Sequence, residues 1–140
     1  MQWSACLNGR TTLGIIPDRY FGLEFPDHRR AFYFLEADRA TMPVMRQRLT
    51  QTSLYRKLLA YEATWTQNIH RDHLRLPRFR VLTVTTSGGR AKHLADACAK
   101  LARGHGLFLF ADSDALRRHG DPLTFPWQTP HSGKTASLLE

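Results

Sequence analysis

Two aromatic and aliphatic segments, Ile16–Phe25 and Phe32–Arg39, constrain the fold of this 140-residue chain more than any other feature. Between them, residues 26–30 read Pro-Asp-His-Arg-Arg, which is typical of a turn. The pattern predicts two antiparallel strands, over about 13–25 and about 31–38, that pair as a hairpin. Because side chains alternate along a strand, the second strand would present two different faces, one with Phe32, Phe34, Glu36 and Asp38 and the other with Tyr33, Leu35 and Ala37.

Three carboxylates, Asp18, Glu36 and Asp38, lie inside or at the ends of these apolar segments. A carboxylate in a half-buried strand costs free energy unless it is paired, hydrogen-bonded or bound to a metal ion. Asp18 and Glu36 would face each other across the hairpin, where two carboxylates repel in the absence of a cation. Mg²⁺ is typically held by one or two carboxylates with waters and a substrate phosphate. We therefore expect Asp18 and Glu36 as candidate ligands of Mg²⁺, or of Mn²⁺ in its place, and Asp38 as a further candidate functional residue.

A structural alternative accounts for the same carboxylates without a metal ion. Asp18 could cap a turn after Pro17, while Glu36 and Asp38 pair with Arg39 or Arg19. The spacing of the residues alone leaves both interpretations open.

A helix is predicted over about 53–68, where one apolar face is formed by Leu54, Leu58, Tyr61 and Trp65. Lys57 lies on the same face, three residues after Leu54 and four before Tyr61. Its ammonium group could orient a water molecule or stabilise negative charge during phosphodiester cleavage. Alternatively, the stem of Lys57 lies along the apolar face and its ammonium stays in water.

The remainder of the chain predicts further strands and helices. Residues 79–86 predict a strand, about 90–103 a helix, 107–110 a strand buried on both faces, and 114–118 a brief helix capped by Ser113. The strand–helix–strand unit from 79 to 110 implies a parallel pair. Together with the hairpin, this predicts an α/β fold with a mixed four-stranded sheet flanked by helices. We expect one domain over 1–127 and a flexible tail over 128–140, and a short basic helical segment over 44–52; residues 1–14 could be a strand or a helix end.

The charge of the chain favours a polyanionic partner. Twenty Lys and Arg against twelve Asp and Glu give a formal net charge of +8. Such a balance is most often found in nucleic-acid-binding proteins, although a basic surface can also serve solubility alone. No apolar segment approaches the roughly 20 residues that a membrane-spanning helix needs, and no signal peptide is visible. Two free cysteines, Cys6 and Cys98, fit a cytoplasmic protein without a disulfide framework.

Three motifs, Pro17-Asp18, Glu36-Ala37-Asp38 and Lys57-Leu58 with Tyr61, resemble the replication-relaxation family of bacterial proteins. That family is typical of actinobacteria and mobile elements and is associated with plasmid replication and DNA relaxation. Most of the resemblance lies in Ile16–Tyr61, and it extends over about 15–127. The layout is also similar to the PD-(D/E)xK nuclease-like superfamily, which implies a restriction-endonuclease-like core of helix, three-stranded meander, helix and strand. Family members often carry a winged-helix region before this domain, and we expect that region to be missing here.

The resemblance implies roles for particular residues. Asp18 and Glu36 would hold a divalent metal ion, and Asp38 stands where the usual motif has a lysine two residues after the acid. Lysine migration to the following helix occurs in that superfamily, and Lys57 would be the migrated residue. Asp38 would then be a further metal ligand or a partner of Lys57, and Tyr61 would order the site or act as a covalent nucleophile.

Three hypotheses about function follow. The first is a Mg²⁺-dependent DNA endonuclease that cleaves or nicks phosphodiesters in plasmid or mobile-element replication. The second is the same fold without catalysis, which serves as a DNA-binding or protein-docking module. The third, independent of the resemblance, is a basic RNA-binding domain, which would need an exposed aromatic surface.

Overall fold

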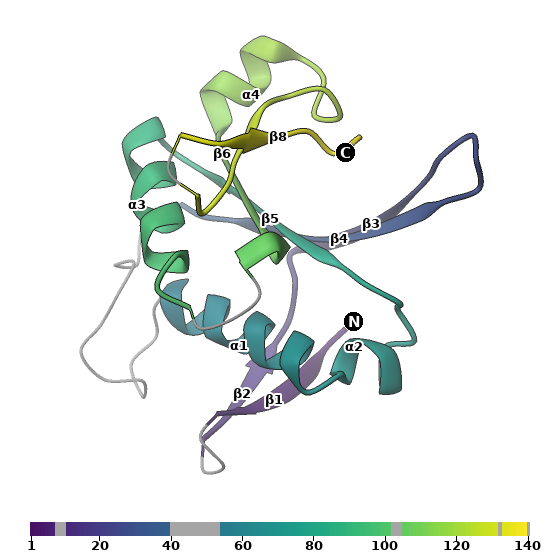
Figure 1. The fold of residues 1–140 in the computed structure, drawn as a ribbon. Helices are drawn as coiled ribbons and strands as arrows, with labels where there is room; N and C mark the ends of the chain where they lie inside the picture. The colour runs from purple at the N-terminus through teal and green to yellow at the C-terminus, as the bar shows by residue number, and fades with distance from the viewer. Residues whose placement is uncertain (8–10, 40–53, 102–104, 132, 140) are drawn as a thin grey trace.

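The computed structural model describes residues 1–7, 11–39, 54–101, 105–131 and 133–139. The described part of the chain forms a six-stranded mixed sheet in the order β3-β4-β5-β6-β7-β8 and a separate two-stranded sheet, β1–β2 (Figure 1). The strands are β1 (Trp3–Leu7), β2 (Thr11–Ile15), β3 (Arg19–Glu24), β4 (Arg30–Ala37), β5 (Arg80–Thr85), β6 (Phe108–Asp112), β7 (Trp127–Gln128) and β8 (Thr135–Ala136). The helices are α1 (Leu54–Thr66), α2 (Ile69–Asp72), α3 (Gly88–Cys98), the 3₁₀ turn η1 (His105–Leu107) and α4 (Ser113–His119).

The predicted hairpin is confirmed, but its first strand is shorter than expected. β3 pairs antiparallel with β4, and Arg19 lies opposite Leu35. The segment expected as one strand over 13–25 is divided, because Pro17 has no N–H to donate to a sheet. β2 ends at Ile15 and pairs with β1, so the strands before α1 form two separate hairpins rather than one three-stranded meander.

The parallel pairing predicted for the later strands is confirmed, and it extends further than expected. β5 pairs parallel with β6, and β4 also pairs parallel with β5. The expectation of four strands was wrong, because β7 and β8 add two antiparallel strands beside β6. Each of these spans only two residues, which is too short to produce an alternating pattern in the sequence.

Two apolar clusters cover the two faces of the large sheet, and Figure 1 shows their helices on opposite sides. Phe34 packs in the first cluster with α1, α3 and the β1–β2 hairpin. Tyr33 packs in the second, with Trp127 and Leu138 from the C-terminal segment. The expected alternation along β4 is therefore confirmed. The segment expected as a flexible tail contributes β8 and the buried Leu138 to this second layer.

Helices α1, α3 and α4 form close to their predicted positions, whereas α2 and the turn η1 were not predicted. The N-cap of α4 is Asp112, whose side chain accepts a hydrogen bond from the Asp114 N–H, rather than the expected Ser113. α3 begins at Gly88 after the N-cap Ser87, two residues earlier than expected, and ends at Cys98. The helical segment expected over 44–52 lies outside the described residues.

Candidate functional site

Glu36 is the centre of a small polar cluster at the carboxyl end of β4. It is buried, and it points to the same side of the sheet as Phe34. Its Oε1 atom accepts a hydrogen bond from the Tyr61 hydroxyl at 2.6 Å. Its Oε2 atom is buried and lies 3.5 Å from the Lys57 ammonium nitrogen, and it has no hydrogen-bond partner among the residues that the structure describes. One carboxylate oxygen is thus fixed, while the other has only the cation beside it.

Helix α1 supplies both groups that contact Glu36. Lys57 and Tyr61 are four residues apart and lie on one side of the helix. Tyr61 is held against the sheet by its stacked contact with Phe34, at 5.9 Å between ring centroids. The Lys57 side chain is 44% exposed, so its ammonium contacts solvent as well as Glu36. The expectation that Lys57 faces Glu36 is confirmed.

Asp18 approaches the cluster from the start of β3. Its N–H donates to the Leu35 carbonyl at 3.1 Å, and its Oδ2 accepts from the Ala37 N–H at 2.8 Å. The β3–β4 register, continued by one residue, sets Asp18 opposite Glu36. Asp18 is exposed, and its negative charge is one cause of the raised pKa of Glu36. The two carboxylates are therefore within electrostatic reach, as predicted.

Burial has the largest effect on both titrating groups at the centre of the cluster. It raises the pKa of Glu36, and the Tyr61 hydrogen bond and the Lys57 charge only partly oppose this. Burial and the neighbouring Glu36 also raise the pKa of Tyr61 far above its ordinary value. A buried phenol that stays protonated is suited to donate a hydrogen bond and poorly suited to act as a nucleophile. The geometry therefore gives Tyr61 an ordering role.

Asp38 belongs to a different interaction. Its Oδ2 accepts from the Thr85 hydroxyl at 2.6 Å and from the Arg90 Nε at 2.8 Å, and its Oδ1 accepts from the Arg90 Nη2 at 3.3 Å. The Asp38 side chain is 3% exposed, so this is a buried ion pair. The expected partnership of Asp38 with Lys57 is replaced by one with Arg90. The alternative partner Arg19 instead donates to the Asp18 backbone carbonyl.

The arrangement narrows the set of residues that could hold a metal ion. Within the described ranges, no three His, Cys, Asp or Glu side chains form a group able to bind one. The expected trio of Asp18, Glu36 and Asp38 is therefore not assembled, because Arg90 and Thr85 engage both oxygens of Asp38. Asp18 and Glu36 remain, and two carboxylates with waters and a phosphate satisfy Mg²⁺. The Glu36 Oε2, buried without a hydrogen bond, fits a cation ligand.

Sequence reasoning did not identify Arg90 as a partner of Asp38. Arg90 lies three residues after the Ser87 N-cap, at the start of the helix that follows β5. Asp38 reaches it only because β4 and β5 are parallel neighbours, so that the carboxyl ends of both strands meet at one edge. One signal in the sequence could have indicated this contact: the strands that end near Asp38 and Thr85 are both followed by polar residues. It would have required a parallel pairing of β4 with β5, whereas the sequence predicted parallel pairing only for β5 and β6.

Comparisons with family models, curated proteins and solved structures gave no match to this chain. None of the helices in the described part of the chain has the length and apolar character needed to cross a membrane. The strand order and the helices define the class of this protein as an α/β domain with a mixed sheet. A functional assignment rests on the geometry of the site.

Proposed function

We propose that this protein acts on DNA through a divalent-metal site formed by Asp18 and Glu36, with Lys57 beside it. The observation that carries the proposal is the buried Glu36 Oε2 atom. Within the described ranges it has no hydrogen-bond partner and faces the Lys57 ammonium, with a second carboxylate across the strand ladder. Asp18 and Glu36 would hold Mg²⁺, or Mn²⁺ in its place. The activity would be cleavage or nicking of phosphodiesters in the cytoplasm, during plasmid or mobile-element replication or relaxation.

The chain's own residues have distinct parts in such a site. A bound divalent ion would supply neutralisation of phosphate charge and a more acidic bound water. Lys57 is half-exposed, so its ammonium can reach a phosphate oxygen and stabilise negative charge that develops there. Tyr61 fixes the direction of the Glu36 carboxylate by holding one of its oxygens. The net charge of +8 favours association with a phosphate backbone.

The fold is compatible with a restriction-endonuclease-like relation, which we also propose. Two acids on an antiparallel hairpin, followed by a helix that carries the lysine, agree with the order of parts in the PD-(D/E)xK superfamily. Two features depart from it: the separate β1–β2 sheet and the Asp38–Arg90 pair at the position two residues after the acid.

A second candidate is DNA binding by the same fold without cleavage. The observation that favours it is Asp38, which occupies the position of the usual lysine and is bound to Arg90. In this case DNA binding would be independent of divalent metal ions and of Glu36.

Nicking of supercoiled plasmid DNA distinguishes the two candidates. We expect the wild-type protein to nick the plasmid with Mg²⁺ or Mn²⁺ and not with EDTA. Asp18→Asn and Glu36→Gln should each lower the rate by about 100-fold or more, since even groups that support metal ligands cost 10–100-fold. The matched control is Asp96→Asn, which neutralises an exposed carboxylate on α3 and should retain the wild-type rate. Plasmid binding without nicking in the wild type would favour the second candidate.

A further inference from the structure

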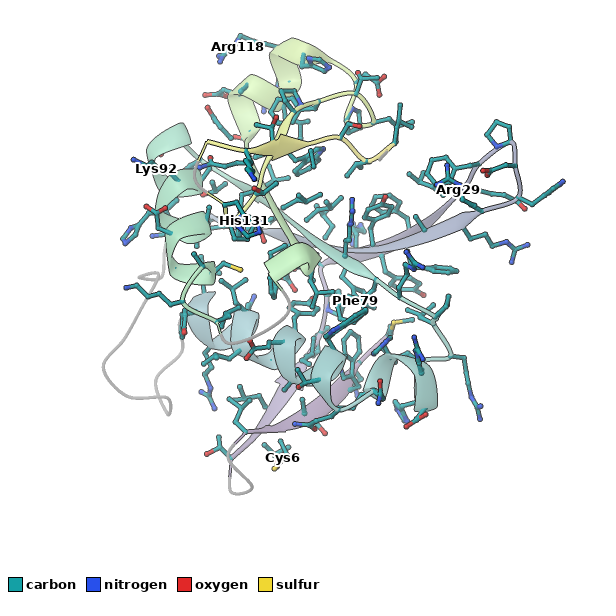
Figure 2. All side chains as sticks on the ribbon, in the orientation of Figure 1. Cys6, Arg29, Phe79, Lys92, Arg118 and His131 are labelled. Atoms are coloured by element: carbon teal, nitrogen blue, oxygen red, sulfur yellow. The ribbon has the colours of Figure 1, made fainter. Side chains whose placement is uncertain are left out.

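A pocket of about 660 Å³ lies at the end of β4 opposite to Glu36. Its walls come from the β3–β4 hairpin, the start of β4, the end of α1 and the residues that lead into β5. Figure 1 shows the hairpin projecting from the sheet, and Figure 2 shows Arg29 on it and Phe79 beside α1. We call this hollow the arginine pocket, after its lining residues Arg29, Arg30, Arg78 and Arg80.

The charge of the arginine pocket is positive, because its lining includes four arginines and no acidic residue. Arg29 and Arg30 form ion pairs with Asp27 and Glu24, but all of these side chains are more than half exposed, so the pairs are weak. Neither Arg78 nor Arg80 has a carboxylate partner among the residues that the structure describes. The pocket therefore presents cationic groups that are available to an anion.

Arg78 indicates where such an anion would bind. It lines the pocket just before β5, and its side chain is exposed. Arg80 begins β5 opposite Tyr33, so its side chain faces the second cluster, and its buried Nη1 atom has no hydrogen-bond partner among the described residues. A guanidinium group in the position of Arg78 can bind a phosphate through two parallel hydrogen bonds.

The remaining walls are aromatic. Phe25, Phe32 and Trp65 line the pocket and are partly exposed. The Arg29 guanidinium lies 5.1 Å from the centre of the Phe25 ring, which is a cation–π contact. Nucleobases stack on aromatic rings and on arginine planes, and proteins that bind single strands combine such surfaces with basic residues. The size of the pocket is within the range of ordinary small-ligand sites.

We propose that the arginine pocket binds a nucleotide unit, with the base against Phe25, Phe32 or Trp65 and the phosphate against Arg78. The unit could belong to a single-stranded nucleic acid or be a free nucleotide, since both present the same base and phosphate. This inference is independent of the Asp18–Glu36 cluster and requires no divalent metal ion.

The test measures binding of a fluorescent eight-residue oligothymidylate and of thymidine 5′-monophosphate, both with EDTA present. Arg78→Gln should weaken binding by about tenfold or more, since a hydrogen bond to a charged group contributes that much. The matched control is Arg118→Gln on α4, an exposed arginine that Figure 2 shows far from Arg29; it should change binding by less than about twofold. EDTA removes the divalent ions that the nuclease proposal needs, so failure here is distinct from failure of that proposal.

Tryptophan fluorescence provides a second readout. Thymidine monophosphate should quench the emission of the wild type, inorganic phosphate should not, and Trp65→Phe should abolish the change. Tighter binding of the octamer by tenfold or more identifies single-stranded nucleic acid as the source, and equal binding identifies a free nucleotide. Absence of binding, equal loss in Arg78→Gln and Arg118→Gln, or equal affinity for inorganic phosphate and the nucleotide would overturn the proposal.

Discussion

At the scale of single residues, opposing effects act on the pKa of Glu36. Burial favours its neutral form, whereas the Tyr61 hydrogen bond and the Lys57 charge favour the carboxylate. Burial has the larger effect, so the pKa of Glu36 is raised. A divalent cation at Oε2 would lower the pKa of Glu36, because a positive charge favours the ionised carboxylate.

The raised pKa of Glu36 predicts how stability depends on pH. Above its ordinary value of 4.5, the folded protein holds a proton that the unfolded chain has lost. The free energy of unfolding therefore falls as pH rises from that value through the folded-state pKa. Glu36→Gln can still accept the Tyr61 hydrogen bond and carries no charge, so it should gain stability relative to the wild type over this range. Urea unfolding between pH 4 and pH 8 measures the difference.

Lys57→Met provides a second test of the raised pKa of Glu36. Lys57 favours the charged form of Glu36, so its removal should make the loss of stability with rising pH larger. A wild type that gains stability relative to Glu36→Gln as pH rises would contradict this account of the carboxylate.

The buried Asp38–Arg90 pair predicts a large loss of stability. Arg90→Met would keep the Thr85 hydroxyl on Asp38 but remove the guanidinium that contacts both oxygens of this buried carboxylate. Removal of one partner from a buried ion pair typically costs about 3–5 kcal/mol. The control Arg118→Met changes an exposed side chain and should alter the free energy of unfolding by less than about 0.5 kcal/mol. Equal effects of the two substitutions, measured by urea unfolding, would show that the pair is not important for stability.

At the scale of elements, long periodic segments were predictable and short ones were not. The apolar face of α1 and the strand at 80–85 have clear patterns, so both were expected close to their actual positions. β7 and β8 have two residues each and form only because the edge of β6 lies beside them. Pro17 divides a segment that otherwise has the pattern of one strand. β7 and β8 thus depend on tertiary context, whereas Pro17 is a local signal of a strand end that the prediction did not use.

In the candidate site too, the contacts set by local patterns were predictable and those set by long-range contacts were not. Asp18, Glu36, Lys57 and Tyr61 come together because one hairpin and one helix face bring them together, and both were visible in the sequence. The partner of Asp38 depends on β4 and β5 being parallel neighbours, and the arginine pocket on four separate segments. Such long-range combinations have no local pattern.

Trp3 attaches the β1–β2 hairpin to the rest of the core, together with the buried Ala5, Leu13 and Ile15. Its ring lies 5.0 Å from Phe34 and 6.2 Å from Tyr61 between centroids, and its indole N–H donates to the Thr64 hydroxyl at 2.9 Å. Trp3→Ala should cost about 3–5 kcal/mol in the free energy of unfolding. Trp3→Phe keeps a ring and loses the hydrogen bond, so its cost should be smaller. A loss below 1 kcal/mol for Trp3→Ala in thermal or urea unfolding would mean that the hairpin contributes little to the core.

At the scale of the whole molecule, the two proposed sites lie at opposite ends of strand β4. The Glu36 cluster lies near the carboxyl end of β4, and the arginine pocket lies at its start. The C-terminal segment covers the opposite face of the sheet and contributes Trp127 and Leu138 to the second cluster. The Tyr33 hydroxyl donates to the Leu138 carbonyl at 3.2 Å, which joins this segment to β4.

Two neighbouring leucines test the contribution of that segment. Leu138 is 1% exposed and Leu139 is 47% exposed. Leu138→Ala should therefore cost about 2–5 kcal/mol, whereas Leu139→Ala should cost less than about 0.5 kcal/mol. Thermal unfolding of the two variants measures the difference. Similar midpoints would indicate that 133–139 does not pack as a second layer in solution.

Calorimetric titration of Mn²⁺ tests the central proposal, that Asp18 and Glu36 share one cation beside Lys57. The wild type should bind one ion, and Asp18→Asn and Glu36→Gln should each lose about 100-fold or more in affinity. Lys57→Met should bind at least as tightly as the wild type, because a competing positive charge next to Glu36 is removed. A wild type that binds no ion, or that binds it with the same affinity as both acid variants, would contradict the account.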